Sequence, residues 1–489
     1  MDAPGRNLDA VADNFVDLAC LRYLGGDLVA TRRRAERLLA ETPELIGQSI
    51  YAAALVGDVA TVRRMLDGDP GLATRKGGPR GWDALLYLCY GRVTPVREGW
   101  DALAAARLLL ERGADPGTRT ILNDVYLFTA LTGAAGDGEG GPVAQPPHPQ
   151  ARALAELLLD AGADPNDESQ VLYNNHFHRD NQWLELLLSR GLRAGRPVNW
   201  APGSMPTLDY LLGVSVRQGF QDRVALLLAH GASAEGRNYY NHRTHHENAL
   251  LDGHTQIAEL LLRQGAQPAV LPPAEQLRAA FLRADAAEVR RLAAAGIEGR
   301  DDAATVIAAA QHGRLVALRM LLDAGASVSS TTPQGIPALH VAAGDGHRLV
   351  AEEMLVRGAS LEVRDPVYGG TPLGRVTWIS RRRPTPEREE VKRFLVTRST
   401  DVFDLVFAGA LERLAVLLAE DPSRATVRRP NGATPLHVLA EREVPDPLPL
   451  LDLLLRHGAA RDARDEKGRT PLDVARELES EELAAALAR

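Results

Sequence analysis

Two short runs of apolar residues at helical spacing lie within residues 335–373. The first begins near Pro337 and ends at Gly346, because glycine readily adopts the left-handed conformation that closes a helix. The second covers about residues 349–356, ends at Gly358 and has one apolar face. An extended segment follows, and Thr-Pro-Leu then begins the pattern again. The sequence therefore predicts a repeated pair of short helices joined by turns.

The ending of the second helix recurs along most of the chain. Segments such as LLERGAD, LLDAGAD and MLVRGAS each contain a glycine at which the second helix is expected to end. Most of these glycines lie 29 to 40 residues apart. They are Gly113, Gly162, Gly191, Gly231, Gly265, Gly296, Gly325, Gly358 and Gly458. Residues 49–75 and 402–428 share a variant pattern in which helix, glycine, helix and Asp-Pro follow one another. Finding the variant twice strengthens the prediction of a repeat.

Three segments begin a helix with Thr-Pro-Leu. ATPLHVLA at 433–440 is the most complete, while RTPLDVA at 469–475 and GTPLG at 370–374 keep most of it. The distance from Pro337 to Thr371 is close to the period of about 33 residues that ankyrin repeats have. The signature of these repeats is T-P-L-H-x-A. The chain resembles the ankyrin repeat family on these residues.

The Thr-Pro-Leu-His motif has a physical explanation at each position. The Thr434 hydroxyl can cap the helix, and Pro435 suits the first helical position, where no N–H is needed. Leu436 is expected to point into the core. His437 is expected to bond to neighbouring backbone and to the Thr hydroxyl. The resemblance implies that this histidine is structural.

We predict an all-α ankyrin-repeat solenoid of helix-turn-helix units with short β-hairpin fingers and about thirteen repeats. Residues 1–47 form a helical N-terminal cap, and residues 48–489 form the repeat array. Within the array, the Gly- and Pro-rich insertion 133–150 is expected to be a flexible loop. The basic segment 380–390 is expected to be a solvated loop, with an anionic partner as the alternative. Residues 469–489 form a short, charged C-terminal capping repeat.

Composition agrees with this architecture. The chain has 489 residues, 45% hydrophobic and only 5% aromatic, which suits small helices packed closely. One compact core would not hold so long a chain, whereas stacked units contact only their neighbours. Only three of the 56 basic residues are lysine, which is typical of a GC-rich bacterial genome.

Charge and cysteine usage narrow the classes of partner and compartment. Nucleic-acid binding is driven by clusters of basic residues, and the net charge of −8 does not favour it. No apolar run is long enough to span a membrane, and the first residues lack a secretory signal. Two distant cysteines, Cys20 and Cys89, argue against a disulfide framework and for a reducing compartment. We expect a cytoplasmic monomer that uses no cofactor.

Four successive central units replace small or apolar residues with Asn, Asp, His and Tyr. Because equivalent positions of stacked repeats become neighbours, these residues are predicted to form a polar row along the concave face. The predicted row comprises Asn123, Asp124, Tyr126, Tyr173, Asn175, His176, Asp209, Tyr210, Tyr239, Tyr240, His242 and His246. One interpretation is a ligand groove, since Tyr and His offer rigid area with a polar tip. The other is structural, with these side chains bonding one another and the finger backbones.

Metal binding and catalysis are two further interpretations. The histidines His176, His178, His242, His245 and His246 could approach one another, yet none has a recognised metal-ligand spacing. A histidine with Asp124 or Asp209 could act as an acid–base pair. The sequence has no nucleophile elbow, P-loop or dinucleotide fingerprint. We therefore expect no metal and no catalytic residue.

The function that the family resemblance implies is non-catalytic binding of another protein, on the concave face and fingers of the array. A stacked array offers a long pre-organised surface, which limits the entropy lost on binding. A small-molecule site among the central Tyr, His, Asn and Asp residues is the alternative. The fold alone identifies no particular partner.

Overall fold

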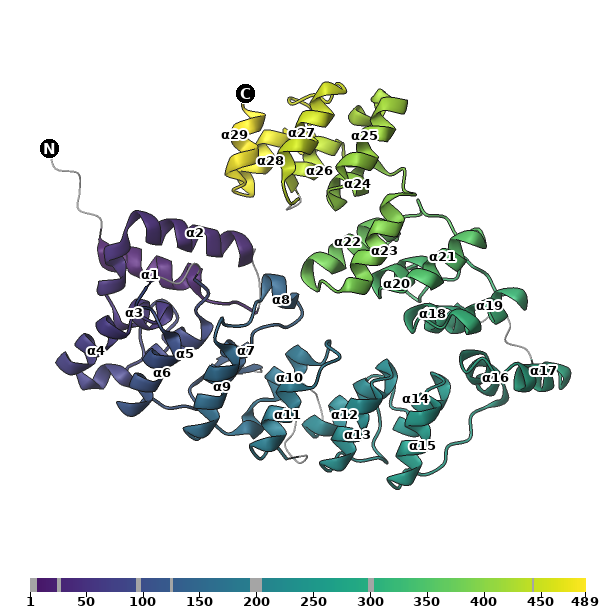
Figure 1. The fold of residues 1–489 in the computed structure, drawn as a ribbon, viewed down its shortest axis with the longest axis horizontal. Helices are drawn as coiled ribbons and strands as arrows, with labels where there is room; N and C mark the ends of the chain where they lie inside the picture. The colour runs from purple at the N-terminus through teal and green to yellow at the C-terminus, as the bar shows by residue number, and fades with distance from the viewer. Residues whose placement is uncertain are drawn as a thin grey trace. The chain divides into compact units, whose positions relative to one another are not determined.

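The structure is a computed structural model, and it describes residues 7–23, 28–93, 98–123, 126–193, 205–297, 303–441 and 444–489. Regular structure in these ranges is mostly helical (Figure 1), as predicted. The chain divides into two compact units: residues 1–249 with 256–269, and residues 250–255 with 270–489. Each unit is described separately below.

The first unit contains short helices, three 3-10 turns and one hairpin. Its elements are α1 (Leu8–Ala19), α2 (Leu28–Glu41), η1 (Pro43–Gly47), α3 (Ile50–Val56), α4 (Val59–Gly68), η2 (Pro70–Ala73), α5 (Ala84–Tyr90), α6 (Ala102–Glu111), β1 (Arg119–Leu122), β2 (Tyr126–Thr129), α7 (Ala130–Ala135), α8 (Gly141–Ala144), α9 (Ala151–Asp160), η3 (Pro165–Asp167), α10 (Ser169–Asn175), α11 (Gln182–Ser189), α12 (Thr207–Gln218) and α13 (Gln221–Ala229). Helices α1, α3, α5, α7, α10 and α12 each contact the next in this series. In a second series, α4 contacts α6, and α6 contacts α9.

The boundary between the units runs through α14 (His245–Leu251) and the start of α15 (Thr255–Arg263). The second unit then has α16 (Pro273–Leu282), α17 (Ala286–Ala294), α18 (Ala303–Gln311), α19 (Leu315–Asp323), α20 (Ala338–Gly344), α21 (Arg348–Val356), α22 (Pro372–Arg382), α23 (Pro386–Val396), α24 (Val402–Ala408), α25 (Leu411–Glu420), η4 (Pro422–Thr426), α26 (Pro435–Glu441), α27 (Pro447–Arg456), α28 (Pro471–Glu477) and α29 (Glu481–Leu487). The even-numbered helices each contact the next, and each packs on the odd-numbered helix that follows it. Several local core clusters result, each spanning a few neighbouring pairs.

The two segments that match in sequence also match in structure. Helix, helix and 3-10 turn follow in the same order as α3–α4–η2 and α24–α25–η4. Ser49 caps α3 by accepting a hydrogen bond from Ala52 N, and Asp401 caps α24 by accepting one from Asp404 N. Gly57 and Gly409 end these helices at φ of +75° and +72°, where a side chain would be strained.

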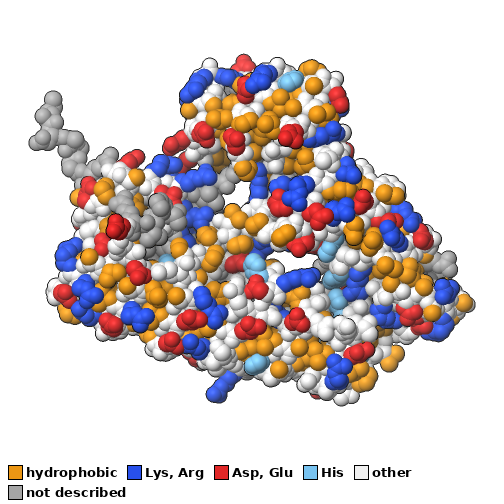
Figure 2. Space-filling model, viewed as in Figure 1, with side chains coloured by type: hydrophobic (Ala, Val, Ile, Leu, Met, Phe, Trp, Pro, Cys, Tyr) orange, Lys and Arg blue, Asp and Glu red, His pale blue; other side chains and the backbone are white. Residues whose placement is uncertain are grey.

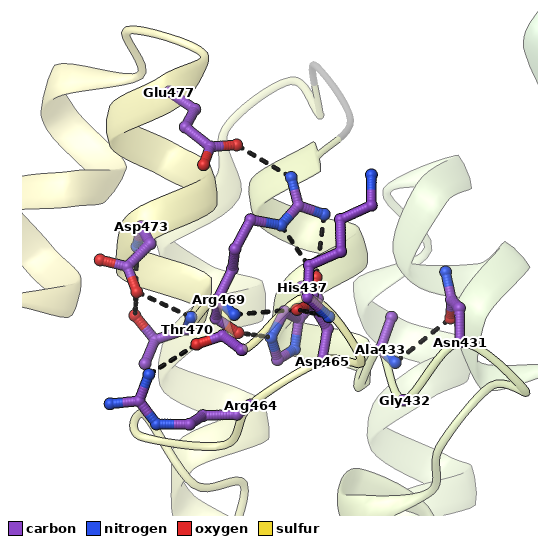
Figure 3. Close-up of polar contacts among 12 residues, drawn as sticks. Asn431, Gly432, Ala433, His437, Arg464, Asp465, Arg469, Thr470, Asp473 and Glu477 are labelled. Atoms are coloured by element: carbon purple, nitrogen blue, oxygen red, sulfur yellow. Dashed lines mark hydrogen bonds and ion pairs between the residues drawn. The ribbon is translucent and has the colours of Figure 1, made fainter.

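His437 makes the bonds predicted for it, to the Thr434 hydroxyl and to neighbouring backbone, and Figure 3 shows the second of them. The Thr434 backbone N–H donates to His437 Nδ1 at 3.2 Å, and the Thr434 hydroxyl lies 2.8 Å from the same atom, so His437 carries its proton on Nε2. That Nε2–H donates to the carbonyl of Arg469, 2.9 Å away in the next finger. His340 makes the equivalent bond to the carbonyl of Gly370 at 3.0 Å. The motif histidine therefore ties one helix to the turn that precedes the next first helix.

The Asn123–Tyr126 part of the predicted row lies before the helix of its unit. Strands β1 and β2 form an antiparallel hairpin in which Leu122 pairs with Tyr126 and Arg119 pairs with Thr129. Asn123 lies at its turn with φ of +53°, a conformation that asparagine tolerates. Asp124 lies outside the described residues. Thr129 then caps α7, so the helix begins four residues after Tyr126.

The insertion 133–150 differs from the flexible loop that its composition predicted. Its first residues belong to α7, and α8 lies within it. Gly133, Asp137, Gln145 and His148 are buried. Asp137 N donates to Gln145 O at 2.6 Å, and His148 N donates to Ala134 O at 2.9 Å. The segment is therefore a folded part of the first unit.

The basic segment 380–390, predicted to be a solvated loop, comprises the end of α22, a short turn and the start of α23. Thr385 caps α23 by accepting from Arg388 N, and Pro386 takes its first position. Arg388 Nε donates to Gly344 O at 2.9 Å, while Arg381 lies 4.4 Å from the centre of the Phe407 ring. The arginines bind backbone and aromatic faces of neighbouring helices, which sequence alone could not indicate.

Other properties of the described residues agree with the sequence. Residues 8–19 and 28–41 are helical as predicted, with Phe15 and Ala19 fully buried. Cys20 and Cys89 are buried free thiols. Acidic and basic side chains are interspersed over the visible face (Figure 2). Among the described residues, every helix is too short or too polar to cross a bilayer.

Candidate functional site

Part of the predicted polar row forms a compact group of rings in the first unit. We define the ring cluster as the six side chains Tyr173, His176, Phe177, Tyr210, Tyr239 and Tyr240. The first three lie at the end of α10 and just beyond it, because α10 ends at Asn175. Tyr210 comes from the first turn of α12, and the last two come from the turn that precedes α14.

Tyr210 is the centre of the ring cluster. Its ring centroid lies 6.4 Å from Tyr173, 6.3 Å from His176, 6.1 Å from Tyr239 and 6.3 Å from Tyr240. These distances lie within the range in which aromatic pairs attract each other beyond their area burial. Tyr210 is 2% exposed. It therefore joins rings from three successive parts of the chain through one buried side chain.

Two of the cluster's rings reach solvent. Tyr240 is 60% exposed and Phe177 is 39% exposed, which is unusual for side chains of this size. The Tyr239 and Tyr240 rings meet edge to face at 5.2 Å, and Phe177 lies 3.9 Å from His176. The cluster thus presents a fixed aromatic surface.

The phenol groups of Tyr173, Tyr210 and Tyr240 are hydrogen-bonded. Tyr210 Oη and Tyr240 Oη lie 2.9 Å apart, and Tyr173 Oη donates to Glu139 Oε1 at 2.7 Å. Burial, followed by these hydrogen bonds, raises the pKa of Tyr173 and of Tyr210. Both remain hydrogen-bond donors at neutral pH.

Arg223 fixes the chain where α10 ends. It donates to the His176 carbonyl at 3.1 Å and to Asn181 Oδ1 at 2.8 Å. Carbonyl groups at a helix C-terminus have no N–H donor within the helix, so a buried guanidinium can provide the missing hydrogen bonds. Burial lowers the pKa of Arg223. His176 Nδ1–H donates to the Tyr173 carbonyl at 2.6 Å, which orients the imidazole toward Phe177.

The remaining residues of the predicted row lie apart from the ring cluster or serve the local backbone. Asn175 donates to Val171 O at 2.9 Å. Asp209 accepts from Ser233 N at 2.6 Å, and burial raises its pKa. His246 Nδ1 accepts from Ala269 N at 3.1 Å, and burial lowers its pKa. His242 is exposed at a turn with φ of +57°. The structural interpretation describes what the side chains of Asn175, Asp209 and His246 do.

Thr244 and Glu247 form a capping box at the start of α14. Glu247 N donates to Thr244 Oγ1, and Thr244 N donates to Glu247 Oε2. His245, which follows Thr244, is fully buried and its ring nitrogens have no hydrogen-bond partner. Burial lowers the pKa of His245 to about 4, so it is neutral at physiological pH.

The space beside the ring cluster is too small for an organic ligand. A cavity next to His176, Trp183 and Arg223 has a volume of about 20 Å³. This is close to the room that a single water molecule requires. Among the described residues, no three His, Cys, Asp or Glu side chains are grouped so that they could hold a metal ion.

Sequence reasoning missed several residues that build the site. Glu139 and Asp137 come from the insertion 133–150, for which the sequence predicted a flexible loop. Asp137 contacts His178 Nε2, and Glu139 accepts from Tyr173. The observed His–Asp contact thus involves neither Asp124 nor Asp209. Phe177 stood in the same segment as Tyr173 and could have been found by searching for aromatic residues. Arg223 gave no signal, since it occupies an ordinary position in an amphipathic helix.

No protein-family model matches the chain, and no curated protein matches it. Among solved structures, it is similar to a chain of the complex between the predatory endopeptidase Bd0816 of Bdellovibrio bacteriovorus and the immunity protein Bd3460. The identity is 21%, the match covers 37% of this chain and 96% of that chain, and the TM-score is 0.29. At this TM-score the match shows neither a common fold nor a common activity.

Proposed function

We propose that this chain is an ankyrin-type repeat array that binds another protein without catalysing a reaction. Residues 8–47 cap the N-terminal end of the array, and the ring cluster is its principal contact surface. The single observation that carries this proposal is the ring cluster, in which exposed rings are held by a buried tyrosine and by hydrogen bonds.

The array part of the proposal is supported by the repetition of one hydrogen bond. His340 and His437 occupy the third position of α20 and α26, and each donates to the carbonyl just before the next Thr-Pro-Leu. The orderly contacts along each series of first helices also support a repeat architecture. Both features agree with the T-P-L-H signature of the ankyrin family.

The binding part is supported by the composition and rigidity of the ring cluster. Tyrosine is enriched among the residues that dominate binding energy at protein interfaces. Rings already packed at 5–6.5 Å from one another lose little side-chain entropy when a partner covers them. Because the adjacent cavity holds only about one water, a partner must cover this surface from outside.

We expect a Phe177→Ala, Tyr240→Ala double variant to lose the protein partner while remaining folded. Both rings are exposed, so their loss should change the free energy of unfolding little. Loss of two interface anchors should weaken binding by about 30-fold or more. The measurement is affinity capture from native lysate with quantitative mass spectrometry, followed by a dissociation constant for each purified candidate.

The matched control is a Val270→Ala, Val356→Ala double variant. These two valines are 88% and 77% exposed, so this variant also shortens two exposed apolar side chains. Circular dichroism should show the same helix content in all three proteins. Equal recovery of the same partners by wild type and the Phe177/Tyr240 variant would contradict the proposed surface.

A further inference from the structure

A cavity of about 270 Å³ lies within the second unit, beside the turn that precedes α22. Ligand pockets have volumes of about 300–1,000 Å³, so this one suits a small molecule. It is lined by Asp365, Tyr368, Gly369, Gly370, Gly374, Arg375, Trp378, Asp404, Phe407, Arg429 and Val438. None of these residues belongs to the polar row that the sequence predicted.

The turn beside the cavity is closed by the same kind of backbone hydrogen bond as a turn near the C-terminus, although it is one residue longer. Asp365 N donates to Gly370 O and Asp465 N donates to Arg469 O, both at 3.0 Å. The glycine before the last turn residue, Gly369 or Gly468, has φ of +67° or +75°. The two turns therefore differ chiefly in their side chains and in one additional residue.

The difference in side chains leaves a carboxylate oxygen without a partner. In the C-terminal turn, Arg469 Nε donates to Asp465 Oδ2 at 3.0 Å (Figure 3). Gly370 stands in the place of Arg469 and has no side chain to donate. Asp365 is 1% exposed, and its Oδ2 is buried without a hydrogen-bond partner. Because such a group is costly, it indicates a missing donor.

The cavity also requires the loss of a motif histidine. The third residue is histidine in α20 and α26, glycine in α22 (Gly374) and aspartate in α24 (Asp404). A Cβ at position 374 would lie only 2.8 Å from Asp404 Oδ2, so glycine is needed there. Asp404 is 3% exposed and accepts from Thr371 N at 3.0 Å. The glycine and the aspartate together leave the space that an imidazole would fill.

Aromatic rings form the outer wall of the cavity. Tyr368 and Trp378 stack with centroids 5.9 Å apart and an angle of 27°, and they are 64% and 38% exposed. Arg375 Cζ lies 5.6 Å from the Tyr368 ring centre. The wall thus offers a planar apolar surface beside a guanidinium.

The charges of the lining select the kind of ligand. Arg429 and Asp404 lie 3.7 Å apart as an ion pair, so their charges largely offset each other. Of the other two charged residues in the lining, Arg375 would repel a simple cation and Asp365 would repel a simple anion. A molecule that carries one positive and one negative group can place each beside an opposite charge. The cavity should therefore bind such a molecule in preference to a simple cation or a simple anion.

We propose that this cavity binds a free α-amino acid with an aromatic or branched apolar side chain. Its ammonium group donates to Asp365 Oδ2, its carboxylate faces Arg375, and its side chain lies against Tyr368 and Trp378. The site is independent of the ring cluster, because all of its residues belong to the second unit.

The test is isothermal titration calorimetry of the full chain with L-phenylalanine, L-tryptophan, L-tyrosine, L-leucine, L-isoleucine and L-valine. At least one should bind with one-to-one stoichiometry. Its N-acetyl and amide derivatives, which lack the ammonium or the carboxylate, should bind about 10- to 100-fold more weakly, as expected from losing one charge-assisted hydrogen bond. If none of the six binds at concentrations up to about 10 mM, any remaining affinity is too weak to be specific, and the proposal is overturned.

Two variants and a matched control locate the site. Asp365→Asn keeps the acceptor that Val367 N and Tyr368 N use but removes the charge, and it should weaken binding about 10- to 100-fold. Trp378→Leu should weaken it as well. Asp465→Asn is the control, since that carboxylate already pairs with Arg469. Unchanged affinity in both Asp365→Asn and Trp378→Leu, or an equal loss in Asp465→Asn, overturns the assignment.

Discussion

Replacing Arg92 with methionine is expected to destabilise the first unit by about 3–5 kcal/mol, the cost of breaking up a buried charged network. Arg92 is 4% exposed and its guanidinium donates to four carbonyls, those of Cys89, Gly91, Gly133 and Pro146. Methionine fills similar volume but leaves these carbonyls without their donor. Burial lowers the pKa of Arg92 to about 10, so the side chain is still charged at neutral pH.

Two measurements check this expectation. Urea unfolding should give the loss of stability, and hydrogen exchange should rise most in residues 133–150, because Arg92 ties Gly133 and Pro146 to the end of α5. Arg112→Met is the matched control. Its ion pair with Asp67, at 2.7 Å, is partly exposed and should contribute less than about 1 kcal/mol. Exchange in residues 133–150 that is no faster in Arg92→Met than in Arg112→Met would contradict the assigned role.

Glu168→Gln is expected to make the protein more stable at alkaline pH and to remove a pH dependence from the wild type. Glu168 is 2% exposed, and its Oε2 accepts from the hydroxyls of Thr129 at 2.7 Å and Thr132 at 3.4 Å. Burial is the main cause that raises the pKa of Glu168 to about 8 in the folded chain, from 4.5. The folded chain therefore keeps a proton that the unfolded chain releases above pH 4.5.

The sign of the effect follows from that difference. The stabilising contribution of Glu168 is complete below pH 4.5 and is lost as pH rises toward 8. The loss across this window is roughly 3–5 kcal/mol for one group. Glutamine is neutral throughout and keeps an oxygen for Thr129, so the variant should not show this decline. Stability curves at several pH values between 4 and 9 measure it.

The control for Glu168→Gln is Glu111→Gln, at an exposed position of α6. It reports the effect of removing one negative charge without disturbing a buried hydrogen bond. Parallel pH curves for wild type and Glu168→Gln would show that Glu168 is ionised in the folded chain, and would rule out the expected gain.

The helical architecture was predictable because its signals are local. Short apolar runs, helix-ending glycines such as Gly409, and caps such as Thr244 with Glu247 each act within a few residues. The match between residues 49–75 and 402–428 appears in the structure for the same reason, since the caps Ser49 and Asp401 and the helix ends at Gly57 and Gly409 form their bonds within a few residues.

The insertion 133–150 could not be predicted because its order comes from distant residues. Glycine and proline in sequence indicate a linker, yet Arg92 holds this segment from more than 40 positions away. The Gly133 backbone lies so close to Tyr90 that an added Cβ would be 2.2 Å from the ring, so glycine here serves close packing. In sequence, a packing glycine and a flexible glycine look alike.

The candidate site was predicted in part. Placing repeats in register found Tyr173, His176 and Tyr210, which the structure brings together. The predicted row also included Asp209 and His246, whose side chains bond to neighbouring backbone amides, as the structural interpretation expects. The register gives the helix position of a residue but not whether its polar atoms already have a partner.

The turn at Asp365 has a consequence for how such chains diversify. Its backbone hydrogen bonds match those of the turn at Asp465, although one turn opens a cavity and the other is closed by Arg469. A Cβ added at position 370 would meet no atom closer than 3.7 Å, so this position can accept a side chain without moving its neighbours. Homologous chains could therefore differ in which units carry a small molecule while keeping the same scaffold, and specificity could evolve one unit at a time.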